Sequence, residues 1–589
     1  MSTESSFNAS STRLSGSSEC EPIRDDRSST LFVRHARERE RLYIPDMAMT
    51  MKMSARLHQS QSRWWCGGGG GGGASSSSSS SSYPNPNKMM MRMMRSNSGR
   101  VQRATTSGVD LNDDSTDDRT KDAMDNLWRW LESRGADVSG TEPYRTNAYQ
   151  EIGSAMDAGW GVRARKPIGK NERAMMVPKT CWLTPDVGYA DGELSRALKS
   201  LPDLAPWTVL ALTLLKERQR GSASDFAPYV QALPKSLDSP LFWSAEELSE
   251  LAGTQLLDNA ASYDSYLRSV YEDLCAGLFQ TYPDVFPLDG ESFFDEASFR
   301  WAFGILRSRA LPPCEGANIA LVPGIDMINH STLSSAKWSA NGGIAGAVAG
   351  LFGGGKDGGG SMRVDATDGA LKAGEPLLVN YAPNGTDSQF ALDFGFVDAV
   401  TPSPGYSLTL SIPEDDPNVY DKLDVLDVAG LSETPSFVLR PYSDPDPELR
   451  TFLRLLNCQG QDAFLLEALF RQQCWQLISD PLSKENEADC CASILDGVSA
   501  ALSAYASRGV DQEKSALTST PGSLTHRQNL AVRVRLAEKS ALIETASFFD
   551  VVASRLDKLE YYQERRLRSL NLLDEDGSST YDPFKETMA

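Results

Sequence analysis

Two segments about fifty residues apart constrain the fold of this chain more than any other feature. The first, ALVPGIDMINHS at 320–331, is a short apolar run that breaks at Pro and Gly and ends in the pair Asn329 and His330. The second, at 377–396, is a strand-like run that ends in Tyr381, before a Pro-Asn-Gly turn and a short apolar stretch. Apolar runs broken by such residues are typical of buried strands that end in turns. The sequence therefore predicts an Asn-His pair and a tyrosine hydroxyl at the ends of two strands.

Length and charge limit the class of protein. A chain of 589 residues exceeds what one hydrophobic core usually serves, so we expect two or three domains plus tails. The net charge of −21 argues against general binding of nucleic acid, because phosphates must be neutralised by basic residues. A protein substrate fits this charge better. No run of 18 apolar residues is present, so we expect no membrane partner. We also expect a monomer.

Cysteine and histidine are too sparse and scattered for a metal centre. The chain has nine cysteines without a CxxC pair and four histidines, so we expect neither a zinc site nor a disulfide framework. The adjacent pair Cys490 and Cys491 is interpreted as small buried residues on a helix. No metal is expected.

The first 120 residues have the composition of a disordered, low-complexity tail, with runs of glycine at 67–73 and serine at 75–82. From 47 to 109 the chain has eight Lys and Arg, many Ser and no acidic residue, as organelle transit peptides do. A solvated tail has the same composition. Because these features lie far from the first methionine and no apolar secretory segment is present, we expect an intracellular protein, with the cytoplasm preferred over a chloroplast or mitochondrion.

The remaining chain shows helical periodicity in several places and strand-like patterning in one. A first ordered helix is predicted from near Asp122 to Gly135, and the Gly- and Pro-interrupted stretch at 147–178 is predicted to form a β-hairpin. Further helices are expected where apolar residues recur at i, i+3, i+4 and i+7. These are 206–221, 260–279, 295–309, 447–458, 462–477, 484–507 and 523–571.

Six stretches of the sequence resemble one known family. Together with the two central segments, GWGVRA at 159–164 and FAPYVQALPKSLDSPLFWSAEELSELAGT at 226–254 resemble the SET-domain protein methyltransferases, in the branch named for the methyltransferase of the Rubisco large subunit. SKENE at 483–487 and RQNLAVRVRLAEKSALIE at 527–544 resemble the helical substrate-binding domain of that branch.

The resemblance implies an α+β fold, in which a β-rich SET domain with a pseudoknot and a helical insertion is followed by an all-α domain. We expect a disordered tail at 1–120, the SET domain at 121–400 with its helical insertion at about 201–300 and a Gly-rich loop at 341–360, a linker at 401–440 and the all-α substrate-binding domain at 441–575.

The resemblance also implies the cofactor S-adenosyl-L-methionine and a set of site residues. Tyr381 is the expected catalytic residue, and Ala382 departs from the glycine that relatives often have after this tyrosine. For Glu172 the alternative is a surface carboxylate at a strand end, and for Arg309 a charge that complements a helix C-terminus. The expected cofactor-binding residues are Gly159, Trp160, Gly161, Glu172, Ala174, Arg309, Asp326, Asn329, His330 and Tyr381.

The activity that follows is that of a protein-lysine N-methyltransferase acting on a non-histone protein, which would dock on the SET cleft and on the helical domain. Two alternatives stay open. One is a protein-histidine methyltransferase, since a relative in this branch methylates actin, and the other is a catalytically inactive SET-like scaffold that binds a protein.

Overall fold

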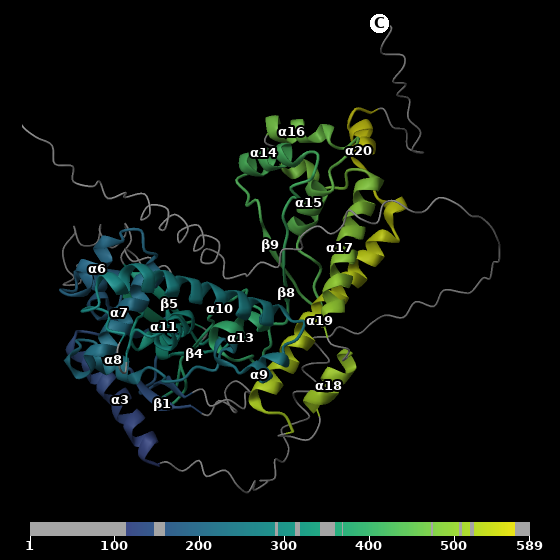
Figure 1. The fold of residues 1–589 in the computed structure, drawn as a ribbon. Coiled ribbons are helices and arrows are strands. Elements are labelled where there is room, and N and C mark those ends of the chain that lie inside the picture. The colour runs from purple at the N-terminus through teal and green to yellow at the C-terminus, as the bar shows by residue number, and fades with distance from the viewer. Residues whose placement is uncertain are drawn as a thin grey trace, which may run out of the picture.

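The computed structural model describes residues 114–146, 159–288, 292–311, 319–341, 360–367, 369–472, 475–505, 509–518 and 523–571. Most of the expected tail and of the expected Gly-rich loop, up to residue 113 and from 342 to 359, therefore lies outside the described residues. The described chain forms a mixed α/β part and a helical part, with the long helix α19 (His526–Ala553) running between them (Figure 1).

The first described helix, α3 (Asp114–Ser133), begins earlier than the sequence predicted and ends where it was expected. Leu127, Trp128 and Leu131 are buried at the predicted helical spacing and anchor the helix on the first core. Gly135 follows with a φ of 87°, a backbone conformation that favours glycine and ends the helix.

Most of the strands form short antiparallel pairs, and the described residues 159–178 do not form the hairpin predicted within 147–178. The strand β2 (Trp160–Ala164) pairs with β1 (Thr141–Arg145), which lies before that stretch. The strand β3 (Arg173–Pro178) pairs instead with β6 (Ser361–Ala366), and β6 pairs with β5 (Ala336–Asn341). The two strands inside the predicted hairpin thus belong to different sheets, because the other edge of β2 is taken by a segment from much later in the chain.

That later segment crosses between two strands. The amide of Leu377 donates to the carbonyl of Val162 in β2 at 2.8 Å. Directly after it, β7 (Leu378–Val379) pairs in parallel with β4 (Asn329–His330). The chain around residue 378 is therefore held between β2 and β4, which places the two central segments of the sequence side by side.

Helices cover this β-rich centre. The helices predicted at 206–221 and 295–309 form with nearly those bounds, and the one predicted at 260–279 begins earlier, at Gln255. The main ones are α7 (Pro206–Arg220), α10 (Gln255–Leu274) with a π-helical turn at Cys275–Phe279, and α11 (Glu296–Arg309). Shorter helices are α5 (Pro185–Ala190), α6 (Leu194–Ser200), α8 (Ala227–Ala232), α9 (Ala245–Ser249) and α13 (Asp387–Phe394).

The stretch 401–440, expected to be a linker, contains folded structure. It holds the antiparallel strands β8 (Tyr406–Thr409) and β9 (Ser436–Leu439) and the helix α14 (Val419–Ala429). Their buried side chains belong to the same second core as the later helices. Strands of only four residues, separated by a segment that contains a helix, are too short for apolar alternation to be recognised. The sequence therefore did not predict them.

The helical part agrees with the prediction in type but not in every boundary. Its helices are α15 (Pro447–Leu456), α16 (Phe464–Gln472), α17 (Lys484–Ala504), α18 (Val510–Thr518), α19 and α20 (Tyr562–Ser569). The helix predicted over 523–571 is interrupted after Ala553, and α18 was not predicted. At this interruption the chain contacts the segment before α17, because the amide of Tyr562 donates to the carbonyl of Leu482 at 3.0 Å. A tertiary contact thus overrides helix propensity here.

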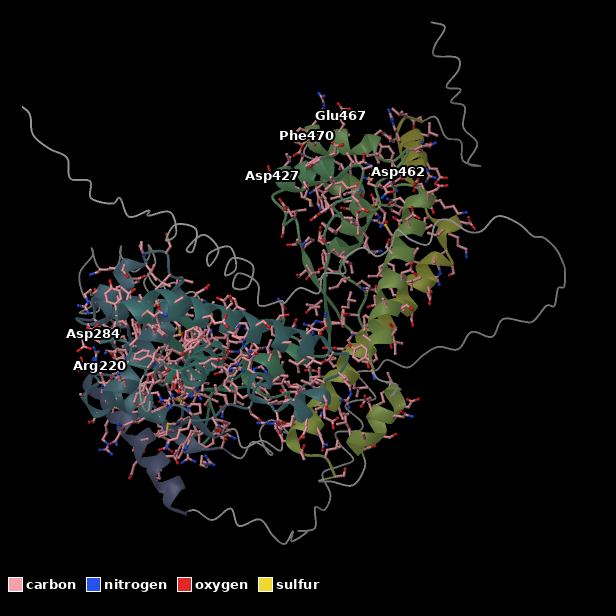
Figure 2. All side chains as sticks on the ribbon, in the orientation of Figure 1. Arg220, Asp284, Asp427, Asp462, Glu467 and Phe470 are labelled. Carbon is pink, nitrogen blue, oxygen red and sulfur yellow. The ribbon has the colours of Figure 1, made fainter. Side chains whose placement is uncertain are left out.

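The two cores share α19. Leu530, Ala531 and Val534 near its start pack in the first core, whereas Leu542 and Phe549 pack in the second. Cys490 and Cys491 are buried on α17 as predicted. Figure 2 shows side chains filling both parts, with Asp427, Glu467 and Phe470 at the outer end of the helical part. Across the described ranges, no helix has the length and apolar character that a bilayer crossing requires.

Candidate functional site

Gly161 in β2 lies directly against Asn329, and Gly159 directly precedes this strand. A Cβ atom on Gly161 would come within 2.6 Å of Asn329 Nδ2 and 2.8 Å of Thr146 Cγ2, distances that real side chains do not adopt. Gly159 has a φ of 70°, and its carbonyl accepts from the amide of Thr146 at 3.0 Å. Glycine is therefore needed at both positions, once for close approach and once for backbone conformation.

His330 and Tyr381 meet, as the family resemblance implied. The amide of Tyr381 donates to His330 Nδ1 at 3.1 Å, and the Tyr381 hydroxyl donates to the carbonyl of Ile328 at 2.7 Å. Burial lowers the pKa of His330 to about 4, so the ring is neutral at pH 7 and can accept this bond. Burial also raises the pKa of Tyr381, which keeps its hydroxyl protonated.

Aromatic rings enclose these two side chains. The ring of Phe390 lies 4.6 Å from His330 and that of Phe394 lies 4.7 Å from Tyr381, measured between centroids. The ring of Trp338 on β5 stacks on that of Tyr381, with 6.4 Å between centroids and 18° between planes. None of these three rings was predicted from the sequence to lie at the site. Apolar spacing in 387–394 signalled only a short helix, because periodicity does not say which site a buried face adjoins.

Arg309 and Asp326 form a second cluster beside the crossing. Arg309 Nη1 donates to the carbonyl of Asp326 at 2.8 Å and lies 3.7 Å from its carboxylate. The hydroxyl of Tyr229 donates to Asp326 Oδ2 at 2.8 Å. Burial raises the pKa of Asp326 to about 6, although Arg309 opposes this shift. Tyr229 was also missed, even though it lies within the family-like stretch at 226–254.

Several buried polar atoms of this site have no hydrogen-bond partner in the described parts of the chain. They are Asn329 Nδ2, Trp160 Nε1, Arg309 Nε and Asp326 Oδ1. A buried polar atom without a partner costs about 1–3 kcal/mol, so such atoms are rare unless a ligand or water satisfies them. Arg309 on α11 contacts Asp326 in the turn before β4, Asn329 follows in β4, and Trp160 lies on β2 next to Gly161. This arrangement suits a ligand rich in hydrogen-bonding groups.

Glu172 and Ala174 lie apart from these contacts. Glu172 is exposed, and its carboxylate accepts the amide of Gly169 at 2.6 Å within a surface turn. Ala174 is buried on β3, where its carbonyl would lie 3.3 Å from a Cβ on Gly140. No contact recorded within the described ranges joins either residue to Asn329, His330 or Tyr381. For Glu172, the geometry matches the alternative of a surface carboxylate at a strand end.

The close approach of Gly161 to Asn329 gives a testable prediction. We expect Gly161→Ala to weaken cofactor binding by about tenfold or more, because the added methyl group must push Asn329 and Thr146 away. Gly192→Ala is the matched control, since its Cβ would point into open space. Titration calorimetry of both variants measures the effect. Equal affinities for the two variants would show that the approach is not needed for binding.

Comparison with known proteins identifies the same family in both parts. The family model of the Rubisco LSMT substrate-binding domain matches residues 413–542. The chloroplastic ribulose-1,5-bisphosphate carboxylase/oxygenase large subunit N-methyltransferase of Nicotiana tabacum is 35% identical over 465 residues, which is 78% of this chain and 88% of that protein. The chloroplastic fructose-bisphosphate aldolase-lysine N-methyltransferase of Arabidopsis thaliana is also 35% identical, over 77% of this chain and 88% of that protein.

A more distant relative and a solved structure extend the comparison. The actin-histidine N-methyltransferase of Homo sapiens is 26% identical over 76% of this chain and 71% of that protein. The crystal structure of the SET domain of LSMT bound to lysine and AdoHcy aligns with a TM-score of 0.65 at 32% identity, covering 79% of this chain and 98% of that one. The chain therefore belongs to the S-adenosylmethionine-dependent SET-domain protein N-methyltransferases, in the Rubisco large-subunit methyltransferase branch.

Proposed function

We propose that this enzyme transfers a methyl group from S-adenosylmethionine to the side-chain amine of a lysine in a non-histone protein. The observation that carries the proposal is the crossing that holds Tyr381 against Ile328, beside Asn329 and inside a ring of aromatic side chains. When bound, the cofactor supplies an electrophilic methyl group on a sulfonium. The protein then has mainly to position and desolvate the acceptor.

The unsatisfied atoms fit the polar groups of this cofactor. Asn329 Nδ2, Trp160 Nε1 and Arg309 Nε are donors that can bind its carboxylate and its ribose or adenine acceptors. Gly161 has no side chain and leaves the backbone of β2 open to close approach. Asp326 is held by Arg309 and Tyr229, so it supports the turn that presents Asn329.

Tyr381 is proposed to orient the acceptor amine. Its hydroxyl is fixed by the bond to the carbonyl of Ile328, and its raised pKa keeps it protonated at pH 7, so it is not available to take a proton from the amine. A lysine in water has a pKa of about 10.4, so only about 0.1% is neutral at pH 7. The apolar rings around Tyr381 favour the neutral amine by desolvation, and the tyrosine oxygen can hold the amine in line with the methyl group.

Lysine is preferred over histidine as the acceptor because of the relatives. The proteins that share 35% identity include a lysine N-methyltransferase, and the solved SET structure holds lysine, whereas the actin-histidine enzyme shares 26%. The inactive scaffold is the less favoured reading, since both His330 and Tyr381 are present and in contact.

The partner is a protein, as the matched substrate-binding domain indicates, and we propose that it docks on both parts of the enzyme. We also propose a chloroplast location. The similar plant relatives are chloroplastic, and the basic, serine-rich composition of 47–109 fits a transit segment. The preference for the cytoplasm finds no support in these relatives.

Radiolabel transfer tests the activity. Purified enzyme is incubated with S-adenosylmethionine labelled in the methyl group and with a chloroplast protein extract, and labelled proteins are hydrolysed to amino acids. We expect label in methyl-lysine. Label in methyl-histidine would show that the acceptor is histidine and not lysine. No enzyme-dependent label in any protein would support the inactive scaffold.

A further inference from the structure

A buried carboxylate joins the helical part of the enzyme to the helix that lines the active site. Glu538 lies on α19, where its side chain has no exposure to solvent. Its Oε1 accepts the hydroxyl of Ser388 on α13 at 2.5 Å. Its Oε2 accepts the hydroxyl of Tyr505, at the end of α17, at 2.5 Å and the amide of Gln255, at the start of α10, at 3.1 Å. One side chain thus ties together four helices.

The basic side chains of Arg535 and Lys539 on the same helix pair with Glu513. No ion pair of Glu538 itself is found in the described ranges. Instead, hydroxyl and amide groups satisfy it, and burial raises its pKa to about 7. A buried acid without a counter-ion is costly, and an apolar side chain of similar volume would often be as stable. Stability alone therefore gives little reason for a glutamate here. The directional bonds it makes give a better one.

The Ser388 bond reaches the active site through a short rigid helix. Ser388 lies in the first turn of α13, whose Phe390 and Phe394 contact the rings of His330 and Tyr381. Thr386 caps the start of this helix, and Gly395 ends it with a φ of 77°. Because α13 has only eight residues, a shift at Ser388 moves both rings.

The Tyr505 bond leads away from the active site. Tyr505 follows the last turn of α17, and the turn around Gly253 packs against its backbone. Lys539 lies over the Tyr505 ring at 5.1 Å. Ser388 and Tyr505 therefore each give one hydroxyl to the same carboxylate, but only Ser388 belongs to the helix that carries the active-site rings.

We propose that Glu538 is a positioning residue, through which the C-terminal helical part sets the placement of His330 and Tyr381 by way of Ser388 and α13. The proposal rests on the proposed methyl transfer. It concerns a residue of the helical part, far from Tyr381 in sequence, and it gives that part a role in the chemical step beyond docking of the protein substrate.

The two hydroxyls provide a matched pair of variants. Ser388→Ala and Tyr505→Phe each remove one oxygen from the same carboxylate, so a purely structural role predicts rate losses that follow the losses of stability. A positioning role predicts otherwise. We expect Ser388→Ala to slow single-turnover methyl transfer by about tenfold, since small misplacements of reacting groups are costly. We expect Tyr505→Phe to stay within about twofold of wild type, even if it lowers the melting temperature more.

The experiment uses the full chain, labelled S-adenosylmethionine and the acceptor protein found by the labelling experiment. Single-turnover rates are measured at saturating cofactor, together with melting temperatures and hydrogen exchange at the amides of 387–394. Faster exchange in Ser388→Ala beside a tenfold slower rate supports the proposal, and Glu538→Gln should lose rate as Ser388→Ala does.

The possible failures are distinguishable. If wild type transfers methyl groups and Ser388→Ala does so equally fast, the positioning role is overturned and the proposed function stands. Rate losses in both hydroxyl variants that simply track their melting temperatures also overturn it. A wild-type chain that transfers no methyl group to any protein overturns the proposed function and, with it, this inference.

Discussion

Tyr381→Phe is expected to lower the rate of methyl transfer by about 100-fold or more, or about 3 kcal/mol in the activation barrier, while cofactor affinity changes little. The substitution removes one oxygen and keeps the ring that packs on Phe394 and Trp338. The hydroxyl, fixed on the carbonyl of Ile328, is the group proposed to align the acceptor amine. Single-turnover rates and calorimetric dissociation constants on the same preparation separate chemistry from binding.

Tyr420→Phe is the control for this substitution. Tyr420 is 81% exposed on α14 in the second part, so loss of its hydroxyl should leave the rate unchanged. Equal turnover by wild type and Tyr381→Phe would remove Tyr381 from the mechanism and favour the inactive scaffold.

Asp393→Asn is expected to lower the free energy of unfolding by about 3 kcal/mol or more, because it leaves a buried cation without its anion. The Asp393 carboxylate accepts from Arg307 Nε at 2.8 Å and also from Nη2. The two side chains are only 2% and 10% exposed. Arg307 also lies over the ring of Tyr263 at 4.2 Å, which does not replace a negative charge. Urea unfolding followed by tryptophan fluorescence measures the loss.

An exposed pair provides the comparison. Glu467 and Arg471 lie one turn apart on α16 at 2.8 Å, and both are about 70% exposed. Glu467→Gln should cost less than about 0.5 kcal/mol, since water screens such pairs. Similar losses for the two variants would mean that the buried pair is not what holds α13 on α11.

The sequence was sufficient where a residue is fixed by a local or motif-level requirement. Gly161 must be a glycine because Asn329 lies against it, and Asn329, His330 and Tyr381 lie at strand ends that meet. The first ordered helix and the helices α7 and α11 follow from apolar periodicity alone. These features depend on neighbours in the chain or on one crossing that the family resemblance supplied.

Contacts between segments that are distant in the chain could not be predicted from the sequence pattern. Nothing in the periodicity of 226–232 or 387–394 says that Tyr229 reaches Asp326, or that Phe390 and Phe394 line the site. The pairing of β2 with β1 rather than β3 depends on the 375–377 segment occupying its other edge. Such choices are made by packing between distant segments, which a pattern of single residues does not encode.

The central claim is that the crossing of β2, β4 and β7 builds a binding site for S-adenosylmethionine around Asn329. Calorimetric titration of the cofactor into wild type and Asn329→Ala tests it most directly. The account predicts saturable binding to wild type and an affinity at least about tenfold weaker in the variant. The reason is that the substitution removes Asn329 Nδ2, the buried donor proposed to bind the cofactor. No binding heat with wild type at millimolar cofactor, or equal affinities for the two proteins, would contradict it.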